Sequence, residues 1–119
     1  MASTRGVKNR AGGVWTEAKY WTFVRSLLRK GWLRYPPRQA VLNNNRVVVT
    51  GKRHRFEYPC AHCDNYFKAT EVQVDHIVPA GSLKDDPASF IQGLYCEPDN
   101  LQVLCKPCHK LKTAEERKR

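Results

Sequence analysis

Two Cys-x-x-Cys pairs constrain the fold of this chain more than any other feature of its sequence. The first pair is Cys60 and Cys63, the second is Cys105 and Cys108, and 41 residues separate them. A spacing of two residues lets a tight turn direct both sulfurs at one ion, and two such pairs make a tetrahedral thiolate site. The spacing therefore predicts a structural Zn²⁺ ion that joins two distant stretches of chain. Redox dithiols and free buried thiols are the less favoured alternatives.

The short length of the chain explains why a structural ion would be needed for stability. The chain has 119 residues, 41% of them hydrophobic, and a single domain of this size buries only about two-thirds of its unfolded surface. It has no apolar run of about 18 residues that could span a membrane, and the first thirty residues have no apolar segment typical of a secretory signal. We therefore expect a cytoplasmic protein with reduced cysteines. The fifth cysteine, Cys96, is interpreted as a small buried apolar residue.

Positive charge is concentrated in one half of the sequence. Residues 1–58 carry a formal charge of +11 and residues 59–119 carry −1, which gives the net charge of +10. Such a density of Lys and Arg attracts polyphosphates, so the pattern predicts a nucleic-acid partner. A solvated basic surface that only aids solubility is the alternative interpretation. An anionic membrane is disfavoured, because the segment lacks a long amphipathic face.

Composition and pattern divide the chain into three parts. Residues 1–13 are small and basic without periodicity, which is typical of a flexible arm. Residues 14–57 form a basic helical segment, and residues 58–119 form a module that contains every cysteine. We expect the fold class to be α+β.

Two helices are predicted in the basic segment. The first covers residues 16–30, begins at Thr16 as its cap and ends at Gly31, with Ala18, Trp21, Val24 and Leu28 on its apolar face. The second begins near Pro37 and reaches about Leu42. Residues 43–55 are open to two interpretations. Val47 to Val49 favour a strand, but the preceding helix could also extend into this stretch.

The C-terminal module reads as short strands and helices. We predict two strands within residues 56–67, a third over 71–77 and a fourth over 101–104. We also predict a helix from Asp86 to about Tyr95 and a final helix over 107–118. The first of these helices is expected to turn Phe90, Ile91 and Leu94 inward.

A second group of polar residues lies beside the cysteine pairs. Asp75 and His76 end a predicted strand, Asn100 precedes the next strand, and His109 follows the last cysteine. A strand hairpin covered by the final helix would bring His109 opposite Asp75. One carboxylate and one imidazole leave most of a divalent ion's coordination shell open, as phosphodiester hydrolysis requires. Imidazoles titrate near neutral pH, so His76 is suited to take a proton from water.

These residues carry a family resemblance. The runs Cys60-Ala-His-Cys63, Val74-Asp75-His76-Ile77-Val78-Pro79 and Asp99 to His109, with Lys110 to Thr113, resemble an HNH endonuclease of the ββα-metal group. The resemblance covers residues 58–119. The helix and the Pro-Pro segment before it are similar to those of small HNH proteins from tailed bacteriophages.

The resemblance implies a role for each matching residue. It implies that His76 is the general base, that Asp75 and His109 hold the catalytic ion, and that Asn100 ties the loop and orients the base. The implied ion is Mg²⁺, Mn²⁺ or another divalent metal, in a one-metal mechanism that yields 5′-phosphate and 3′-hydroxyl ends. The interval of 24 residues from His76 to Asn100 exceeds that of minimal family members.

The resulting hypothesis is a metal-dependent DNA endonuclease or nickase from a bacteriophage, acting in the host cytoplasm. DNA is the predicted partner, phage terminase or another packaging protein is a candidate partner, and no membrane or small-molecule cofactor is expected. The residues expected to contact DNA are Arg25, Arg29, Arg34, Arg38, Lys52, Arg53, Arg55, Lys110 and Lys112. For Lys110 and Lys112, an exposed helix face is an equal alternative.

Two other function classes compete with this hypothesis. A non-catalytic, zinc-stabilised DNA-binding or packaging accessory protein would account for the positive charge and the paired thiols. It would not account for the expected clustering of Asp75, His76 and His109. A cytotoxic nuclease of the bacteriocin type would require translocation and immunity partners.

Overall fold

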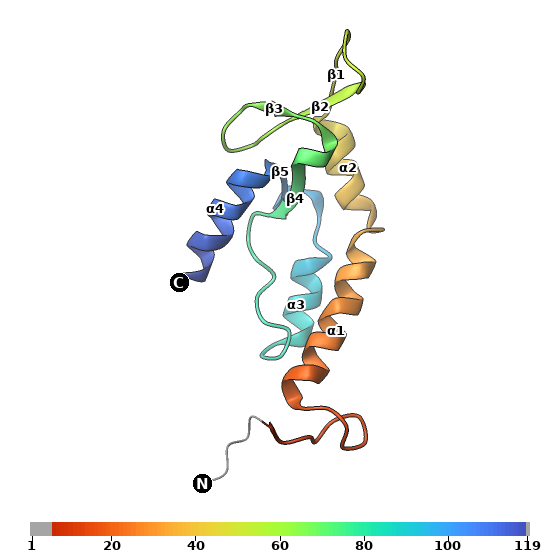
Figure 1. The fold of residues 1–119 in the computed structure, drawn as a ribbon, viewed down its shortest axis with the longest axis vertical. Helices are drawn as coiled ribbons and strands as arrows, with labels where there is room; N and C mark the ends of the chain where they lie inside the picture. Colours follow the sequence, from red (N-terminus) through yellow and green to blue (C-terminus); the bar gives the residue numbers. More distant parts are fainter. Residues whose placement is uncertain (1–5, 119) are drawn as a thin grey trace. The chain divides into compact units, whose positions relative to one another are not determined.

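The computed structural model describes residues 6–118, which divide into two compact units (Figure 1). The first unit contains residues 6–34 and Ala80–Tyr95, and the second contains Tyr35–Pro79 together with the chain from Cys96 onward. The described elements are α1 (Glu17–Trp32), α2 (Pro36–Asn45), β1 (Val47–Val48), β2 (Phe56–Pro59), β3 (Tyr66–Phe67), the 3₁₀ helix η2 (Ala69–Glu71), β4 (Val72–His76), α3 (Pro87–Leu94), the 3₁₀ helix η3 (Pro98–Asn100), β5 (Leu101–Cys105) and α4 (Lys106–Arg117). These are mixed helices and small sheets, as the α+β prediction requires.

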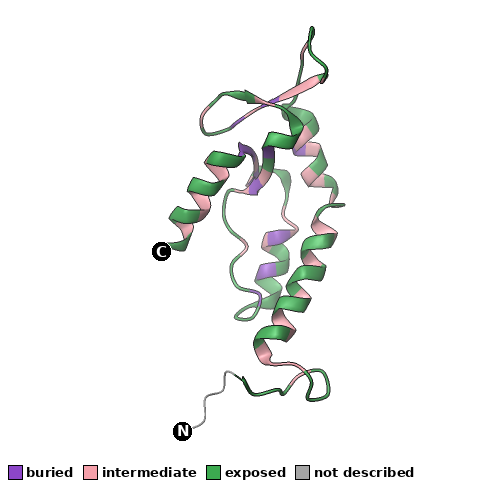
Figure 2. Cartoon of the chain, viewed as in Figure 1, coloured by how far each residue is buried: buried purple, intermediate pink, exposed green. Residues whose placement is uncertain are grey.

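Two capped helices build the first unit. The Thr16 hydroxyl accepts a hydrogen bond from the Lys19 amide at the start of α1, and an Asp86 carboxylate oxygen accepts one from the Ser89 amide at the start of α3. These caps satisfy amides that have no partner inside the helix. The buried core of the unit consists of Leu83, Phe90 and Leu94, against which Trp21, Val24, Leu28, Trp32, Ala80 and Tyr95 pack. Figure 2 shows the buried positions along α3.

Three details of the first unit differ from the sequence prediction. Helix α1 does not end at Gly31 but continues to Trp32. The Tyr95 hydroxyl donates a hydrogen bond to the Leu28 carbonyl and lies where a side chain on Gly31 would project, so glycine here permits close packing. Ala18 is exposed. Ile91 is also exposed, because a helix that packs on one side buries Phe90 and turns its neighbour outward.

The predicted flexible arm covers residues 1–13, of which the first five lie outside the described residues. Arg10 pairs with Trp15 in a tight turn, and its guanidinium donates to both carboxylate oxygens of Glu17 at 2.8 and 3.0 Å. It also lies over the Tyr20 ring, 4.3 Å from the centroid. Arg10 thus anchors the described end of this segment to α1.

The second unit begins with a helix and a small sheet. Helix α2 buries Val41 and contacts β2, β4, β5 and η3. Both interpretations of residues 43–55 are partly right, because α2 extends to Asn45 and a strand follows at Val47–Val48. Strand β1 pairs antiparallel with β2, and β2 pairs with β3 around the first cysteine turn. Asp64 in that turn adopts a left-handed conformation (φ 65°), which Asp tolerates better than most residues.

Strands β4 and β5 form a separate antiparallel pair that positions the site. His76 pairs with Leu101, Asp75 with Gln102, and Val72 with Cys105. Helix α4 begins directly after Cys105 and contacts both strands. The predicted strand, connection, strand and helix are therefore present.

The compact units do not coincide with the three predicted parts of the chain. Helix α2, which buries Val41, contacts the β4–β5 pair, whereas Phe90 of α3 belongs to the core against which residues of α1 pack. Residues 14–57 and 58–119 each contribute to both units for this reason. Within the described residues, no helix combines the length and the apolar character needed to cross a membrane.

We expect Phe90→Ala to destabilise the protein by about 3 kcal/mol or more, because the side chain is 3% exposed and its removal leaves a cavity in the small core of the first unit. Chemical denaturation monitored by circular dichroism measures the loss. Ile91→Ala is the matched control, since Ile91 is 41% exposed. Equal losses for the two variants would contradict the described packing of α3.

The anchor at Arg10 predicts an acid-dependent contribution to stability. The hydrogen bonds from Arg10 and Trp21 lower the pKa of Glu17 from 4.5 to about 2. A lowered pKa in the folded state means that the carboxylate stabilises the fold above pH 4.5 and loses this effect as the pH falls through about 2. The difference in unfolding free energy between wild type and Glu17→Gln should therefore be constant near neutral pH and shrink between those values. A constant difference down to pH 2 would contradict the prediction.

Candidate metal and catalytic sites

The four paired cysteines converge on one point in the second unit. The sulfurs of Cys60, Cys63, Cys105 and Cys108 all lie within 4.8 Å of one another, and Cys63 Sγ is 4.0 Å from Cys105 Sγ. Four thiolates bound to Zn²⁺ at about 2.3 Å in a tetrahedron would be about 3.8 Å apart. The donor set and its spacing therefore fit a tetrahedral metal ion.

Backbone and side-chain donors surround these sulfurs. The His62 amide donates to Cys60 Sγ at 3.4 Å, and the Asn65 side chain donates to Cys63 Sγ at 3.6 Å. Burial raises the pKa of the Cys60 thiol, but amide donors from Cys63, Cys105 and His62 outweigh burial and lower the pKa to about 6.

The thiols of Cys105 and Cys108 have a raised pKa, which opposes the thiolate form. The hydrogen bond with Cys105, followed by burial, raises the pKa of the Cys108 thiol to about 12. Burial, the largest cause, also raises the pKa of Cys105. Adjacent negative charges repel in a site of low polarity, so a bound metal ion is what would let all four sulfurs ionise.

Asp75 and His109 meet in a second location, between β4 and α4. Asp75 Oδ1 lies 3.7 Å from His109 Nε2, and the Asp75 side chain is only 8% exposed. This separation is too long for a hydrogen bond. It is short enough for both atoms to bind one ion, because two ligands at about 2.1 Å from an ion are at most about 4.2 Å apart.

Lys112 and Gln102 hold the other oxygen of Asp75. Lys112 Nζ lies 3.1 Å from Asp75 Oδ2 and donates to the His76 carbonyl at 2.9 Å and to Glu116 at 2.7 Å. The Gln102 amide donates to the same Oδ2 at 3.0 Å. Burial lowers the pKa of Lys112, but its bonds to Glu116 and Asp75 outweigh burial and raise the pKa. The buried carboxylate thus has a permanently charged neighbour.

Asn100 fastens the loop that follows His76. Its side-chain oxygen accepts from the Val78 amide at 2.9 Å, and its side-chain nitrogen donates to the Val78 carbonyl at 3.1 Å. The Asn100 carbonyl accepts from the Ile77 amide at 2.8 Å. Since His76 pairs with Leu101, the histidine and Asn100 lie at the same end of the β4–β5 pair.

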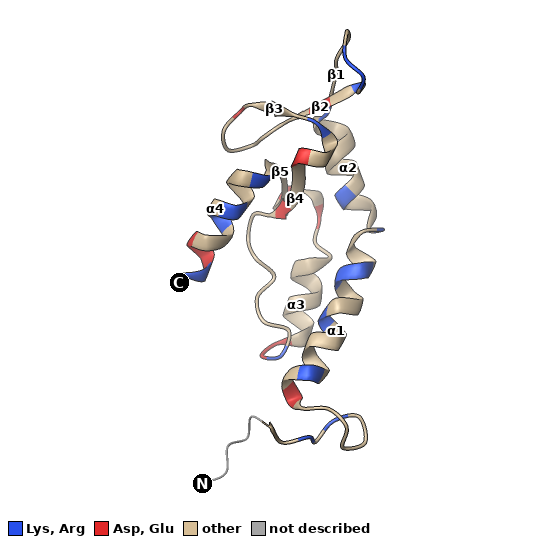
Figure 3. Cartoon of the chain, in the orientation of Figure 1, with Lys and Arg blue, Asp and Glu red and all other residues tan. Residues whose placement is uncertain are grey.

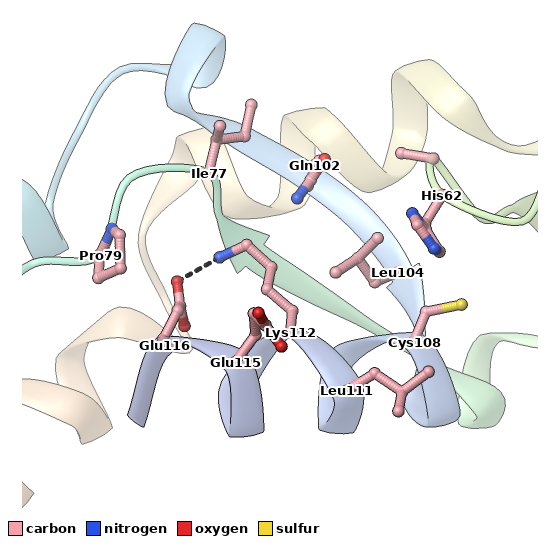
Figure 4. A pocket seen from close by; sticks show the side chains of 11 residues that line it. His62, Ile77, Pro79, Gln102, Leu104, Cys108, Leu111, Lys112, Glu115 and Glu116 are labelled. Carbon is pink, nitrogen blue, oxygen red and sulfur yellow. Dashed lines mark hydrogen bonds and ion pairs between the residues drawn. The ribbon is translucent and has the colours of Figure 1, made fainter. Parts of the chain in front are cut away.

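A groove adjoins this site. Its volume is about 780 Å³, and its walls come from the first cysteine turn, the loop after β4, strand β5 and helix α4 (Figure 4). Gln102 and Lys112, which both contact Asp75, line it beside Leu104 and Leu111. His62, which lies between the first two cysteines in the sequence, also lines the groove and is exposed.

The predicted DNA-contacting residues occur in both units. Figure 3 shows the Lys and Arg positions along the chain in blue. Arg25, Arg29 and Arg34 belong to the first unit and are exposed. Arg25 and Arg29 lie four residues apart on α1, and partial burial together with the positive charge of Arg25 lowers the pKa of Arg29. In the second unit Arg38 is half-buried, Lys52 binds Glu57 at 2.7 Å, and Arg53, Arg55 and Lys110 are exposed.

The sequence analysis missed two residues of the Asp75 environment, Gln102 and Glu116, and assigned a third to a different contact. Lys112 is predicted at a phosphate or on an exposed face, whereas its ammonium lies against Asp75. The strand register could have revealed Gln102, because a hairpin that pairs Asp75 with residue 102 puts the two side chains on one face.

We expect the purified protein to contain one tightly bound metal ion per chain, held by the four converging thiols. Cys105→Ser should lose this ion and unfold at a lower temperature, because removal of one ligand opens the site. Elemental analysis of dialysed protein and thermal unfolding provide the two measurements. Cys96→Ser is the control, since Cys96 lies outside the cluster. A full metal content in Cys105→Ser would show that the ion binds elsewhere.

Two comparisons with known proteins match the segment that carries these sites. The family model for the HNH endonuclease matches residues 60–115. A protein of Lactococcus phage SK1, described as a probable HNH endonuclease, is 40% identical over 63 residues, which cover 53% of this chain and 62% of the relative. The chain thus spans somewhat less than two-thirds of that relative's length. No solved structure matches the chain significantly. The matched segment contains both cysteine pairs, Asp75, His76, Asn100 and His109, so residues 60–115, a little under half of the chain, are similar to HNH endonucleases.

Proposed function

We propose that this protein is a metal-dependent DNA endonuclease or nickase that hydrolyses phosphodiester bonds at Asp75, His76 and His109. The observation that carries the proposal is the approach of Asp75 Oδ1 to His109 Nε2, which lie 3.7 Å apart between β4 and α4 in the segment that matches the HNH endonuclease model. Chance contacts between a buried carboxylate and a partly exposed imidazole are common. Here, however, the two residues are also those to which the family resemblance assigns the catalytic ion.

The two metal positions have different chemistry. The four sulfurs fill a tetrahedral shell, so we assign Zn²⁺ and a structural role to that position. Asp75 and His109 offer one oxygen and one nitrogen and leave room for water and phosphate, so we assign Mg²⁺, Mn²⁺ or another divalent ion to them. When bound, this ion would neutralise charge on the phosphate and on the leaving oxygen.

The protein residues would perform the remaining steps. His76 is the proposed general base, which takes the proton of the attacking water. Asn100 keeps the loop after His76 in place through its paired bonds to Val78. The carbonyl of His76 also accepts a bond from Lys112, so α4 restrains the backbone that carries the base. The proposed products are 5′-phosphate and 3′-hydroxyl ends.

DNA binding is proposed for basic side chains of both units. Backbone phosphates would be contacted by five exposed arginines, namely Arg25, Arg29, Arg34, Arg53 and Arg55. The positive electrostatic potential that attracts DNA would also include contributions from Lys52, Arg38 and Lys110. Lys112 is better explained by its bond to Asp75 than by a phosphate contact. Phosphate contacts carry little sequence information, so we expect modest sequence preference and strong dependence on salt.

A bacteriophage origin belongs to the same proposal and is supported by the phage relative. The site of action would then be the cytoplasm of the host cell. A partnership with terminase or another packaging protein is a further proposal, which co-purification from infected cells would test.

We expect His76→Ala to lower the rate of plasmid cleavage at least about 100-fold, because a general base contributes roughly that factor or more. Zinc-loaded protein and supercoiled plasmid are incubated in metal-free buffer with or without added Mg²⁺ or Mn²⁺, and nicked and linear products are separated on a gel. Cleavage should require the added ion. His54→Ala is the control, because His54 binds Glu57 away from the site.

Equal cleavage by His76→Ala and wild type would remove His76 from the mechanism. Full activity without added ion would contradict the open site at Asp75 and His109. Wild-type protein that shifts DNA in a gel but cuts with neither ion would instead favour the non-catalytic DNA-binding alternative.

A further inference from the structure

We propose that Gln102 is a positioning residue that makes Asp75 present a single oxygen to the catalytic ion. This inference rests on the proposed function, because it takes Asp75 as a ligand of that ion. Family resemblance gave Gln102 no role, and the inference comes from its hydrogen bond to the Asp75 carboxylate.

The two oxygens of Asp75 have different surroundings. Oδ2 accepts the Gln102 amide at 3.0 Å and lies 3.1 Å from the Lys112 ammonium. Oδ1 faces His109 Nε2 at 3.7 Å. The donors on Oδ2 compete with any ion for that atom, whereas Oδ1 points at the second proposed ligand. The carboxylate is therefore arranged to bind an ion through Oδ1.

Strand pairing makes this arrangement rigid. Asp75 and Gln102 are direct partners in the β4–β5 register, so their side chains leave neighbouring strands on the same face. Residues opposite each other in antiparallel strands have Cβ atoms about 5 Å apart, a distance that a glutamine spans without strain. The bond fixes the rotation of the carboxylate about its own axis, which the backbone alone leaves free.

Burial increases the effect that loss of the Gln102 hydrogen bond would have on Asp75. The Asp75 side chain is 8% exposed, so water cannot replace a lost donor freely. Figure 4 shows Gln102 and Lys112 lining the same groove. The hydrogen bond of Gln102 and the ion pair of Lys112 both go to Asp75 Oδ2. Lys112 also binds the His76 carbonyl and Glu116, so its replacement would disturb several contacts. The bond that the structure describes for the Gln102 side chain goes to Asp75, which makes Gln102 the cleaner test.

The experiment measures Mn²⁺ binding to the full-length, zinc-loaded protein by electron paramagnetic resonance of free Mn²⁺. Gln102→Met keeps the length of the side chain but cannot donate, and it should weaken Mn²⁺ binding about 10- to 100-fold, as loss of a partner behind a metal ligand does. The Mn²⁺ concentration for half-maximal cleavage should rise by the same factor, with a smaller change in rate at saturating Mn²⁺. Gln73→Met is the matched control, because Gln73 is an exposed glutamine on β4.

The outcomes separate the inference from the proposed function. If wild type binds no Mn²⁺ beyond what His109→Ala binds, the proposed catalytic site is wrong. If wild type binds Mn²⁺ through His109 and Gln102→Met binds it equally well, only the role of Gln102 is wrong. Thermal unfolding shows whether each variant is folded. Should Gln102→Met not fold, Gln102→Asn provides the same test, because its amide is one methylene too short to hold Oδ2, and unaltered Mn²⁺ affinity would again reject the inference.

Discussion

The register of the β4–β5 pair is the constraint on which the candidate site depends. Pairing of His76 with Leu101 sets Asp75 opposite Gln102 and leaves Asn100 beside the loop that it fastens. The same register ends β5 at Cys105, from which α4 turns back across both strands and brings His109 and Lys112 to Asp75. A shift of one residue would reverse the face of every side chain on one strand and separate these groups.

The four cysteines tie this arrangement to the rest of the second unit. They connect the turn between β2 and β3 with the junction of β5 and α4, and the Ala61 amide donates to the Val103 carbonyl across the same boundary at 2.8 Å. Cys60, Leu104 and Cys105 form a buried cluster with Phe67 packed against it. Such a core is too small to fix α4 by apolar contact alone, so a metal ion at the sulfurs would contribute much of the rigidity that the site requires.

Local sequence patterns predicted most of the elements, and spacing predicted the convergence of the cysteines. Thr16 as the cap of α1, Asp86 as the start of the next predicted helix and the predicted strand over 71–77 agree closely with the elements described. The predicted end of α1 at Gly31 was wrong. Glycine at this position permits close contact with Tyr95, a residue distant in the sequence, and does not mark the end of the helix. The prediction that Ile91 faces inward was also wrong, because an apolar side chain does not by itself show which face of a helix is covered.

The candidate site, like the fold, could be predicted from the sequence only in part. The proximity of Asp75 and His109 followed from the order of elements, but the contacts of Gln102, Lys112 and Glu116 depend on register and on side-chain reach, which periodicity does not report. The packing of α3 against α1 and of α2 against the β4–β5 pair depends on long-range burial. No local signal near the predicted boundaries at residues 13 and 57 encodes it.

The most direct test of the account is the anomalous scattering of Mn²⁺ in crystals of the zinc-loaded protein soaked in that ion. The account predicts a manganese peak between β4 and α4, about 2.1 Å from both Asp75 Oδ1 and His109 Nε2, with Asp75 Oδ2 still held by Gln102. A fully soaked crystal in which manganese is absent from this position, or binds Asp75 without His109, would contradict it.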